Sequence, residues 1–103
     1  MYRVEDITNL DGVIINNKIE YCKIFKLGNI VTGWFMIKNG SVFSYSEKLI
    51  TFPFDAKSEM REYTFEGNYN FYYTIYKRQN SIRYLVPNGY VINNAMGNFM
   101  FFI

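Results

Sequence analysis

Three glutamates are the first candidates for chemistry in this 103-residue sequence, which contains no histidine and therefore lacks the commonest general base. Glu59, Glu62 and Glu66 lie close enough in sequence to provide the two carboxyl groups that glycoside hydrolysis needs. Glu62 and Glu66 would share one face of a strand. Lys57 and Arg61 lie beside them, however, so a solvated face of mixed charge is the favoured interpretation.

No other pattern in the sequence favours catalysis or a cofactor. Asp6 and Asp11 lack the spacing of a calcium loop, and a single cysteine without histidine forms no zinc pattern. Cys22 has no neighbour that would activate it, so we expect a small apolar strand residue. Nucleophile-elbow, phosphate-loop and dinucleotide motifs are absent from the sequence. We therefore expect a protein that is not an enzyme and that uses no metal and no cofactor.

Aromatic residues are the most suggestive feature, since tyrosine, phenylalanine and tryptophan make up 20% of the chain. The densest stretch is 69-YNFYYTIY-76. Exposed tyrosines beside asparagine and arginine offer stacking platforms with polar tips, which suit sugar rings or bases. The alternative is that these rings fill the core or pair across strands. The candidate ligand-binding residues are Tyr72, Tyr76, Arg78, Arg83, Tyr84, Asn88 and Tyr90.

Charge and hydropathy limit the partners that we expect. The formal net charge is only +2, and the basic residues are scattered among acidic ones rather than clustered. Such a pattern does not favour nucleic-acid binding. No apolar run approaches the ~18 residues of a membrane span, and no signal peptide is visible after Met1. We expect neither a nucleic-acid partner nor insertion into a membrane.

The elements that must position these residues are short strands joined by tight turns. The clearest is a hairpin over Ile19–Ile37 that turns at Gly28-Asn29. Its second strand has two largely apolar faces, one with Val31 and Phe35 and the other with Trp34. We expect one face to meet the core and the other to meet another sheet or another chain.

The last residues, 99-FMFFI-103, show no polar alternation. A strand that is buried on one face would alternate, so this pattern predicts cover on both faces. In so small a domain, another protomer is the expected second cover. The predicted oligomer-interface residues are Trp34, Phe99, Phe101 and Ile103.

Strands spaced about ten residues apart predict an all-β fold, as an antiparallel β-sandwich of jelly-roll type or a barrel. The length predicts one domain over residues 1–103. Within it, we interpret residues 1–17 as a connecting segment and residues 18–103 as the head.

The string 21-YCKIFKLGNIVTGWFMIKNG-40 resembles a strand-turn-strand found near the C-terminal ends of bacteriophage tail-fibre and baseplate receptor-binding proteins. In that family the strand pair is followed by a short Leu-Pro segment, to which 50-ITFPFDAKSEM-60 is similar. The final 98-NFMFFI-103 resembles the family's closing strand. The family's Gly-Phe-Arg-Pro stretch is replaced here by Asp55–Ser58.

The resemblance implies a β-sandwich head that assembles as a homotrimer in a virion tail and binds a host cell-surface saccharide. Three hypotheses stay open. The first is this receptor-binding tip, in which weak sites add by avidity. The second is a structural module of a virion or surface complex that contacts only protein. The third, a small barrel that binds single-stranded nucleic acid through its tyrosine-rich face, would need a basic groove.

Overall fold

The computed structural model describes residues 3–64 and 71–103, and within them every regular element is a β-strand in antiparallel pairing. The all-β prediction is confirmed. The strands are β1 (Val4–Asp6), β2 (Ile14–Ile15), β3 (Ile19–Leu27), β4 (Ile30–Ile37), β5 (Ser41–Phe43), β6 (Glu47–Thr51), β7 (Met60–Tyr63), β8 (Tyr72–Ile75), β9 (Ser81–Leu85), β10 (Tyr90–Ile92) and β11 (Met96–Phe102).

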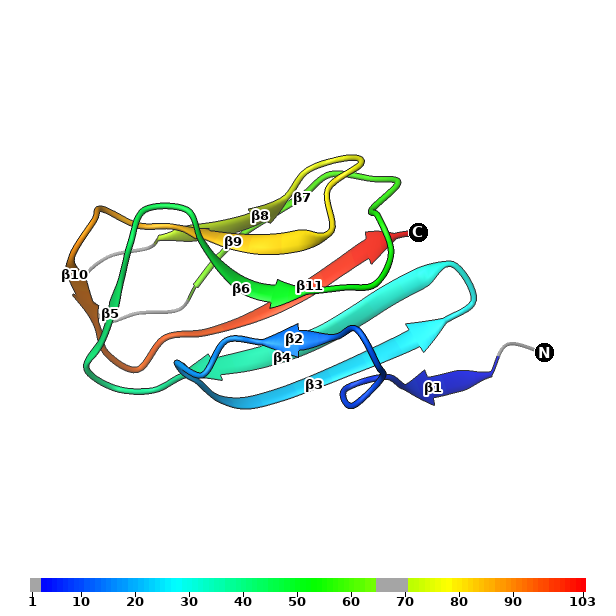
Figure 1. Ribbon diagram of the computed structural model, residues 1–103, viewed down its shortest axis with the longest axis horizontal. Coiled ribbons are helices and arrows are strands. Elements are labelled where there is room, and N and C mark those ends of the chain that lie inside the picture. Colours follow the sequence, from blue (N-terminus) through cyan, green and yellow to red (C-terminus); the bar gives the residue numbers. More distant parts are fainter. Residues whose placement is uncertain (1–2, 65–70) are drawn as a thin grey trace.

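Two sheets pack face to face, so the fold is a sandwich rather than a barrel. Sheet A has the strand order β1-β3-β4-β11, and sheet B has the order β2-β6-β9-β8-β7. A separate pair, β10-β5, lies at one end of the 42 Å long axis, and β1 lies with the C-terminus at the other (Figure 1). The arrangement leaves each sheet with free edge strands, which a closed barrel would not have.

The predicted hairpin is present as β3 and β4. Gly28 occupies the turn with φ +57°, a left-handed conformation that glycine adopts without steric cost. Val31, Phe35 and Ile37 are buried on the inner side of β4, whereas Trp34 points to the outer side and is exposed. The prediction that one face of this strand meets the core is confirmed.

The N-terminal segment does more than connect. β1 pairs with β3 in sheet A, and β2 pairs with β6 in sheet B. Between them, the backbone N–H of Ile7 donates to the carbonyl of Ile24 at 2.9 Å, and the Ile7 side chain is buried. Residues 4–15 therefore join the two sheets along one flank of the sandwich, instead of lying outside a head that begins at residue 18.

Aromatic rings from both sheets fill the space between them. Phe35 of sheet A meets Tyr73 of sheet B edge to face, with ring centroids 4.9 Å apart. Gly33 makes room for a second ring, because a Cβ atom there would lie 2.6 Å from Cζ of Phe99 and 2.2 Å from the carbonyl oxygen of Lys23. A glycine at this position therefore lets the centre of sheet A close around the Phe99 ring.

β11 corrects the prediction for the C-terminal run. Phe99 and Phe101 are buried in the core of their own chain, so their side chains present almost no surface to another protomer. Met100 and Phe102 point to the other side and are exposed. The side chains of residues 99–102 thus alternate between buried and exposed although all of them are apolar. The side chains available to a partner are those of Met100 and Phe102. Ile103 is half-buried, and its N–H donates to the carbonyl of Asn29 at 2.8 Å.

Candidate functional site

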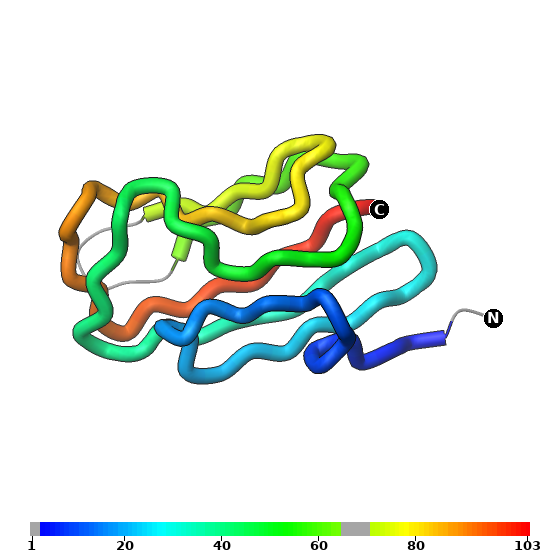
Figure 2. Tube along the Cα trace, in the orientation of Figure 1, coloured from blue at the N-terminus to red at the C-terminus, as the bar shows by residue number. Residues whose placement is uncertain are grey.

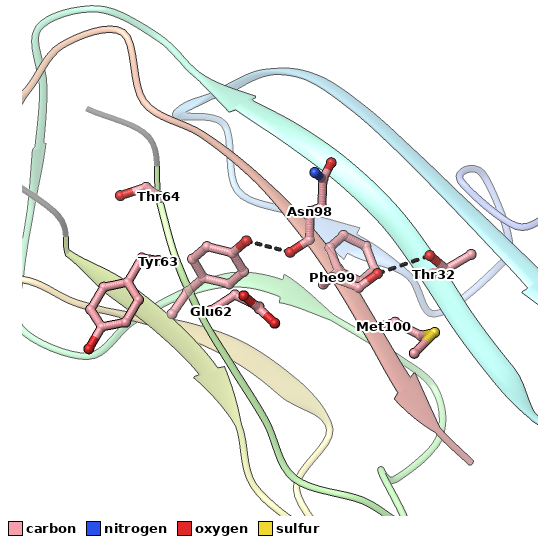
Figure 3. A pocket seen from close by; sticks show the side chains of 8 residues that line it. Thr32, Glu62, Tyr63, Thr64, Asn98, Phe99 and Met100 are labelled. Carbon is pink, nitrogen blue, oxygen red and sulfur yellow. Dashed lines mark hydrogen bonds between the residues drawn. The ribbon is translucent and has the colours of Figure 1, made fainter. Parts of the chain in front are cut away.

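The two flanks of the sandwich are built differently. The chain between β1 and β2 closes one flank. On the other, β7 of sheet B runs beside β11 of sheet A, with Cα atoms within 8 Å of each other but no strand pairing between them (Figure 3). An intervening strand would need about 9.5 Å between its two neighbours. This flank is therefore open at its surface yet too narrow for an added strand.

A groove of about 560 Å³ lies along this open flank. Its volume falls within the roughly 300–1,000 Å³ range of small-molecule sites. Sheet B contributes residues of β7 and β8, and sheet A contributes residues of β4 and β11. The lining residues are Thr32, Glu62, Tyr63, Thr64, Tyr73, Asn98, Phe99 and Met100.

The backbone of β11 presents polar groups to the groove. Ala95 and Ile103, on either side of this strand, both hydrogen-bond toward the β4 side at 2.8 Å. Because the direction of backbone groups alternates along a strand, the N–H and C=O groups of Asn98 and Met100 point away from β4. They face the open flank instead.

Three outward groups of β11 have hydrogen-bond partners among the described residues, whereas those of Met100 have none. The Tyr73 hydroxyl donates to the carbonyl of Asn98, as Figure 3 shows. The N–H of Lys57 donates to the carbonyl of Phe102 at 2.7 Å, and the N–H of Phe102 donates to Oγ of Ser58 at 2.9 Å. Within the described part of the chain, the outward N–H and C=O of Met100 have no such partner. The N–H of Asn98 also has no partner among the described residues, so the groove has two free donors and one free acceptor.

Among the described residues that line the groove, Glu62 is the one with a carboxylate. It lies opposite Tyr73 in the β7–β8 register, so both side chains point toward the space between the sheets. Burial raises the pKa of the Tyr73 hydroxyl well above its usual range, and the Glu62 carboxylate raises it further. Tyr73 therefore stays protonated and remains a donor. Among residues 3–64 and 71–103, the Glu62 carboxylate has no hydrogen-bond or ion-pair partner.

Tyr63 lies at the edge of the groove, and its ring points to the outer side of sheet B (Figure 3). Tyr63 is 57% exposed and meets Tyr72 edge to face, with ring centroids 5.7 Å apart. The Arg61 guanidinium lies over the same Tyr72 ring, 4.6 Å from its centroid. Thr64 closes the inner end of the groove, where its hydroxyl is 2.8 Å from that of Tyr84. The site therefore combines a carboxylate, free backbone groups and an aromatic surface.

The seven residues predicted to bind a ligand do not come together. Tyr76 and Arg78 lie in the β8–β9 turn, which is at the other end of strand β9 from the β9–β10 turn that holds Asn88 (Figure 2). Tyr90 is half-buried and packs edge to face on Phe71 at 4.8 Å. None of the seven lines the groove. The structure therefore offers no single site composed of these residues.

Two of the seven have structural roles instead. Tyr84 is fully buried, with its ring 5.3 Å from that of Phe43, so it presents no surface to a ligand. The Arg83 guanidinium donates to the carbonyl of Ser46 at 2.8 Å, and Ser46 has a positive φ of 63°. Arg83 thus secures the β5–β6 turn. The prediction for Tyr84 was wrong because the burial of a tyrosine in a strand depends on which sheet face it occupies.

The sequence analysis assigned Glu62 to a solvated face, and its side chain is indeed exposed. Its position beside the groove had a signal in the alternation of β7, because Glu62 has the same parity as Met60 and Thr64, which are both buried. Glu66, which the sequence analysis paired with Glu62, lies outside the described residues. Tyr63, Asn98 and Met100 had no distinguishing local pattern, because their role depends on β7 lying beside β11.

The remaining reactive groups give no second site. Burial raises the pKa of the Cys22 thiol to about 11, which agrees with its interpretation as an apolar strand residue. Within the described ranges, no three histidine, cysteine, aspartate or glutamate side chains gather as metal ligands would. The same residues include no helix long and apolar enough to cross a membrane.

Comparison with protein-family models, curated proteins and solved structures found no match for this chain. The site must therefore be interpreted from its own geometry.

Proposed function

We propose that this domain is a non-catalytic binding module that takes a saccharide in the groove between β7 and β11. The single observation behind the proposal is that the unpaired Glu62 carboxylate and the free backbone groups of Met100 line the same groove. Sugar hydroxyls can both donate to a carboxylate and accept from an N–H. The exposed face of Tyr63 at the rim suits the apolar face of a sugar ring.

Among the described residues, the lining of the groove has one carboxyl group, which supports binding in this proposal. Glycoside hydrolysis needs two carboxyl groups on either side of the scissile bond. Glu62 is the acidic residue that the described lining contains. Its role in the proposal is therefore that of a hydrogen-bond acceptor.

The resemblance to phage receptor-binding heads extends the proposal to a host cell-surface saccharide and to a tail-fibre tip in the virion tail. An adhesive tip of this kind works with weak sites that are repeated in an assembly. One shallow groove per chain fits this mode of binding. The alternative, a structural module that contacts only protein, is favoured by the apolar outer face of sheet A described below.

A glycan array followed by titration of the best hit tests the proposal. We expect Glu62→Gln to weaken binding by about tenfold, since a hydrogen bond to a charged group contributes about 1.5 kcal/mol or more. Tyr63→Ala should weaken it to a similar extent. Tyr45→Ala is the matched control, because Tyr45 is equally exposed but lies in the β5–β6 turn.

Two results would overturn the groove as the site. One is an array with no hit, which would favour the structural module. The other is binding that Tyr76→Ala abolishes while Glu62→Gln leaves it intact, which would place the site at the β8–β9 turn.

A further inference from the structure

The outer face of sheet A is apolar and uncovered by any described part of the chain. We use this name for the side of β1, β3, β4 and β11 that points away from sheet B. Its large exposed side chains are Val4, Tyr21, Trp34, Met96, Met100 and Phe102. Monomeric soluble proteins seldom expose apolar surface of this kind without using it.

The strand register joins these side chains into one continuous surface. Val4 lies opposite Leu27, Leu27 opposite Ile30, and Ile30 opposite Phe102, so one row is apolar across all four strands. Residues that are directly opposite in neighbouring strands share a face. The exposed groups are therefore not scattered hydrophobic residues, which would need no explanation.

Most of the charge on this face is paired within the face. Asp6 and Lys23 form an ion pair, with Lys23 Nζ 3.4 Å from Oδ2 of Asp6, and Glu20 at the bulge near the start of β3 is the one further charged residue on this side among those described. Hydrogen bonds from the hydroxyl and backbone N–H of Thr8, together with Lys23, lower the pKa of Asp6. A partner with a strong charge of either sign would find little complement here. A second face with equally little unpaired charge would meet it with little repulsion.

The area is adequate for a stable pair. The six side chains are between 42% and 63% exposed. With roughly 200 Å² on each large side chain, they offer on the order of 600 Å². Half-buried neighbours such as Leu27 and Met36 add to this. A standard interface buries about 800 Å² on each partner.

We propose that two copies of this chain pack through the outer faces of their sheets A, related by a two-fold axis. A two-fold interface uses the same patch on both subunits, so the patch must match itself in shape and charge. An apolar sheet face with little unpaired charge satisfies this condition, and two such faces pack about 10 Å apart in aligned sandwiches. The pairing stands independently of saccharide binding, although it would bring two grooves into one assembly.

Sedimentation velocity over a range of concentrations tests the pairing. We expect the wild-type chain to have a molar mass in solution of twice the 12.3 kDa of one chain. Trp34→Lys and Phe102→Lys should each weaken association by at least ~100-fold, the effect of placing an unpaired charge at an apolar interface. Val91→Lys is the control, because Val91 is also half exposed but lies on β10.

The intact chain provides a second readout that does not depend on variant folding. Trp34 is its only tryptophan, so burial at the interface should shift its emission to the blue as concentration rises. A chain that stays monomeric to ~1 mM would overturn the proposal, since that limit leaves only about 4 kcal/mol for association. A trimer would also overturn it. So would a dimer that forms without a change in Trp34 emission and that persists in both lysine variants.

Discussion

The two sheets have similar inner faces and different outer faces. Inside, both contribute buried aromatic and aliphatic residues to one core. Outside, sheet A presents apolar rows, whereas sheet B presents the row Lys48–Arg83–Thr74–Arg61 across four strands. This row makes the exterior of sheet B more polar than that of sheet A, although Thr74 is buried and the next row, Leu85–Tyr72–Tyr63, is apolar. Sheet A has the exterior of a sheet that is covered, and this difference locates the interface.

The difference also separates the two functions proposed for the molecule. The groove lies at the junction of the sheets and uses a few polar groups with exact directions. The outer face of sheet A offers apolar area and has almost no hydrogen-bonding groups. The proposed ligand site and the proposed protein interface therefore adjoin along β11, and Met100 belongs to both.

The largest expected effect contrasts the two sides of β11. Phe101→Ala should reduce the free energy of unfolding by about 3–5 kcal/mol, because it leaves a cavity in the core beside the Phe52 ring. Phe102→Ala should cost about 1 kcal/mol or less when the protein is dilute, since half of that side chain is already exposed. Urea unfolding of both variants at low protein concentration measures the contrast. Equal losses would mean that the outer side of β11 is covered within one chain.

A smaller effect is expected on the outer face of sheet B. Arg83→Met should cost about 1–2 kcal/mol, because it removes the charged hydrogen bond to the carbonyl of Ser46. Lys48→Met is the matched change on the neighbouring strand, where no hydrogen bond is lost, and should stay within about 0.5 kcal/mol. Thermal and urea unfolding compare the two. If Lys48→Met were as damaging, the polar row would stabilise the sheet by charge rather than by this one contact.

The smallest effect depends on pH. Partial burial opposes ionisation of Glu47, but hydrogen bonds from Lys18, Ser44 and Asn16 hold its pKa below the usual 4.5. A lowered folded-state pKa gives a stabilisation that is present above the unfolded pKa and is lost as pH falls through the folded value. Because the Lys18–Glu47 pair is partly exposed, we expect at most ~1 kcal/mol.

Glu47→Gln provides the measurement for this pair. The variant should be less stable than wild type at pH 7, and the difference should disappear as the solution is acidified below the folded pKa of Glu47. Added salt should also reduce it. A difference that persists in acid would assign the effect to the shape of the side chain and not to its charge.

Much of the fold could be predicted because it rests on local signals. The Gly28-Asn29 turn and the apolar positions of β4 specify the β3–β4 hairpin within twenty residues. The fold class follows from strand-forming residues interrupted by turns. The inner assignment of Val31 and Phe35 also came from alternation alone, and the structure confirms it.

The candidate site was less accessible to prediction. Tyr84 and Arg78 belong to sequence patterns that look equally suitable for binding, yet one is in the core and the other is in a turn at the end of the sandwich. Periodicity assigns residues to alternate sides of a strand, but it does not say which side the other sheet covers when both are apolar. Phe99–Ile103 shows this most clearly.

The sequence by itself determined that the chain forms short antiparallel strands, where its main hairpin turns, and that it has more aromatic surface than one small core needs. Only the tertiary structure decided that Phe99 and Phe101 face inward while Met100 and Phe102 face outward. It also decided that Glu62 and Met100 line the same groove. The physical reason is the distance in sequence over which each signal acts. Turns and alternation depend on neighbouring residues. The proximity of β7 and β11 depends instead on the packing of two sheets, whose strands are far apart in the chain.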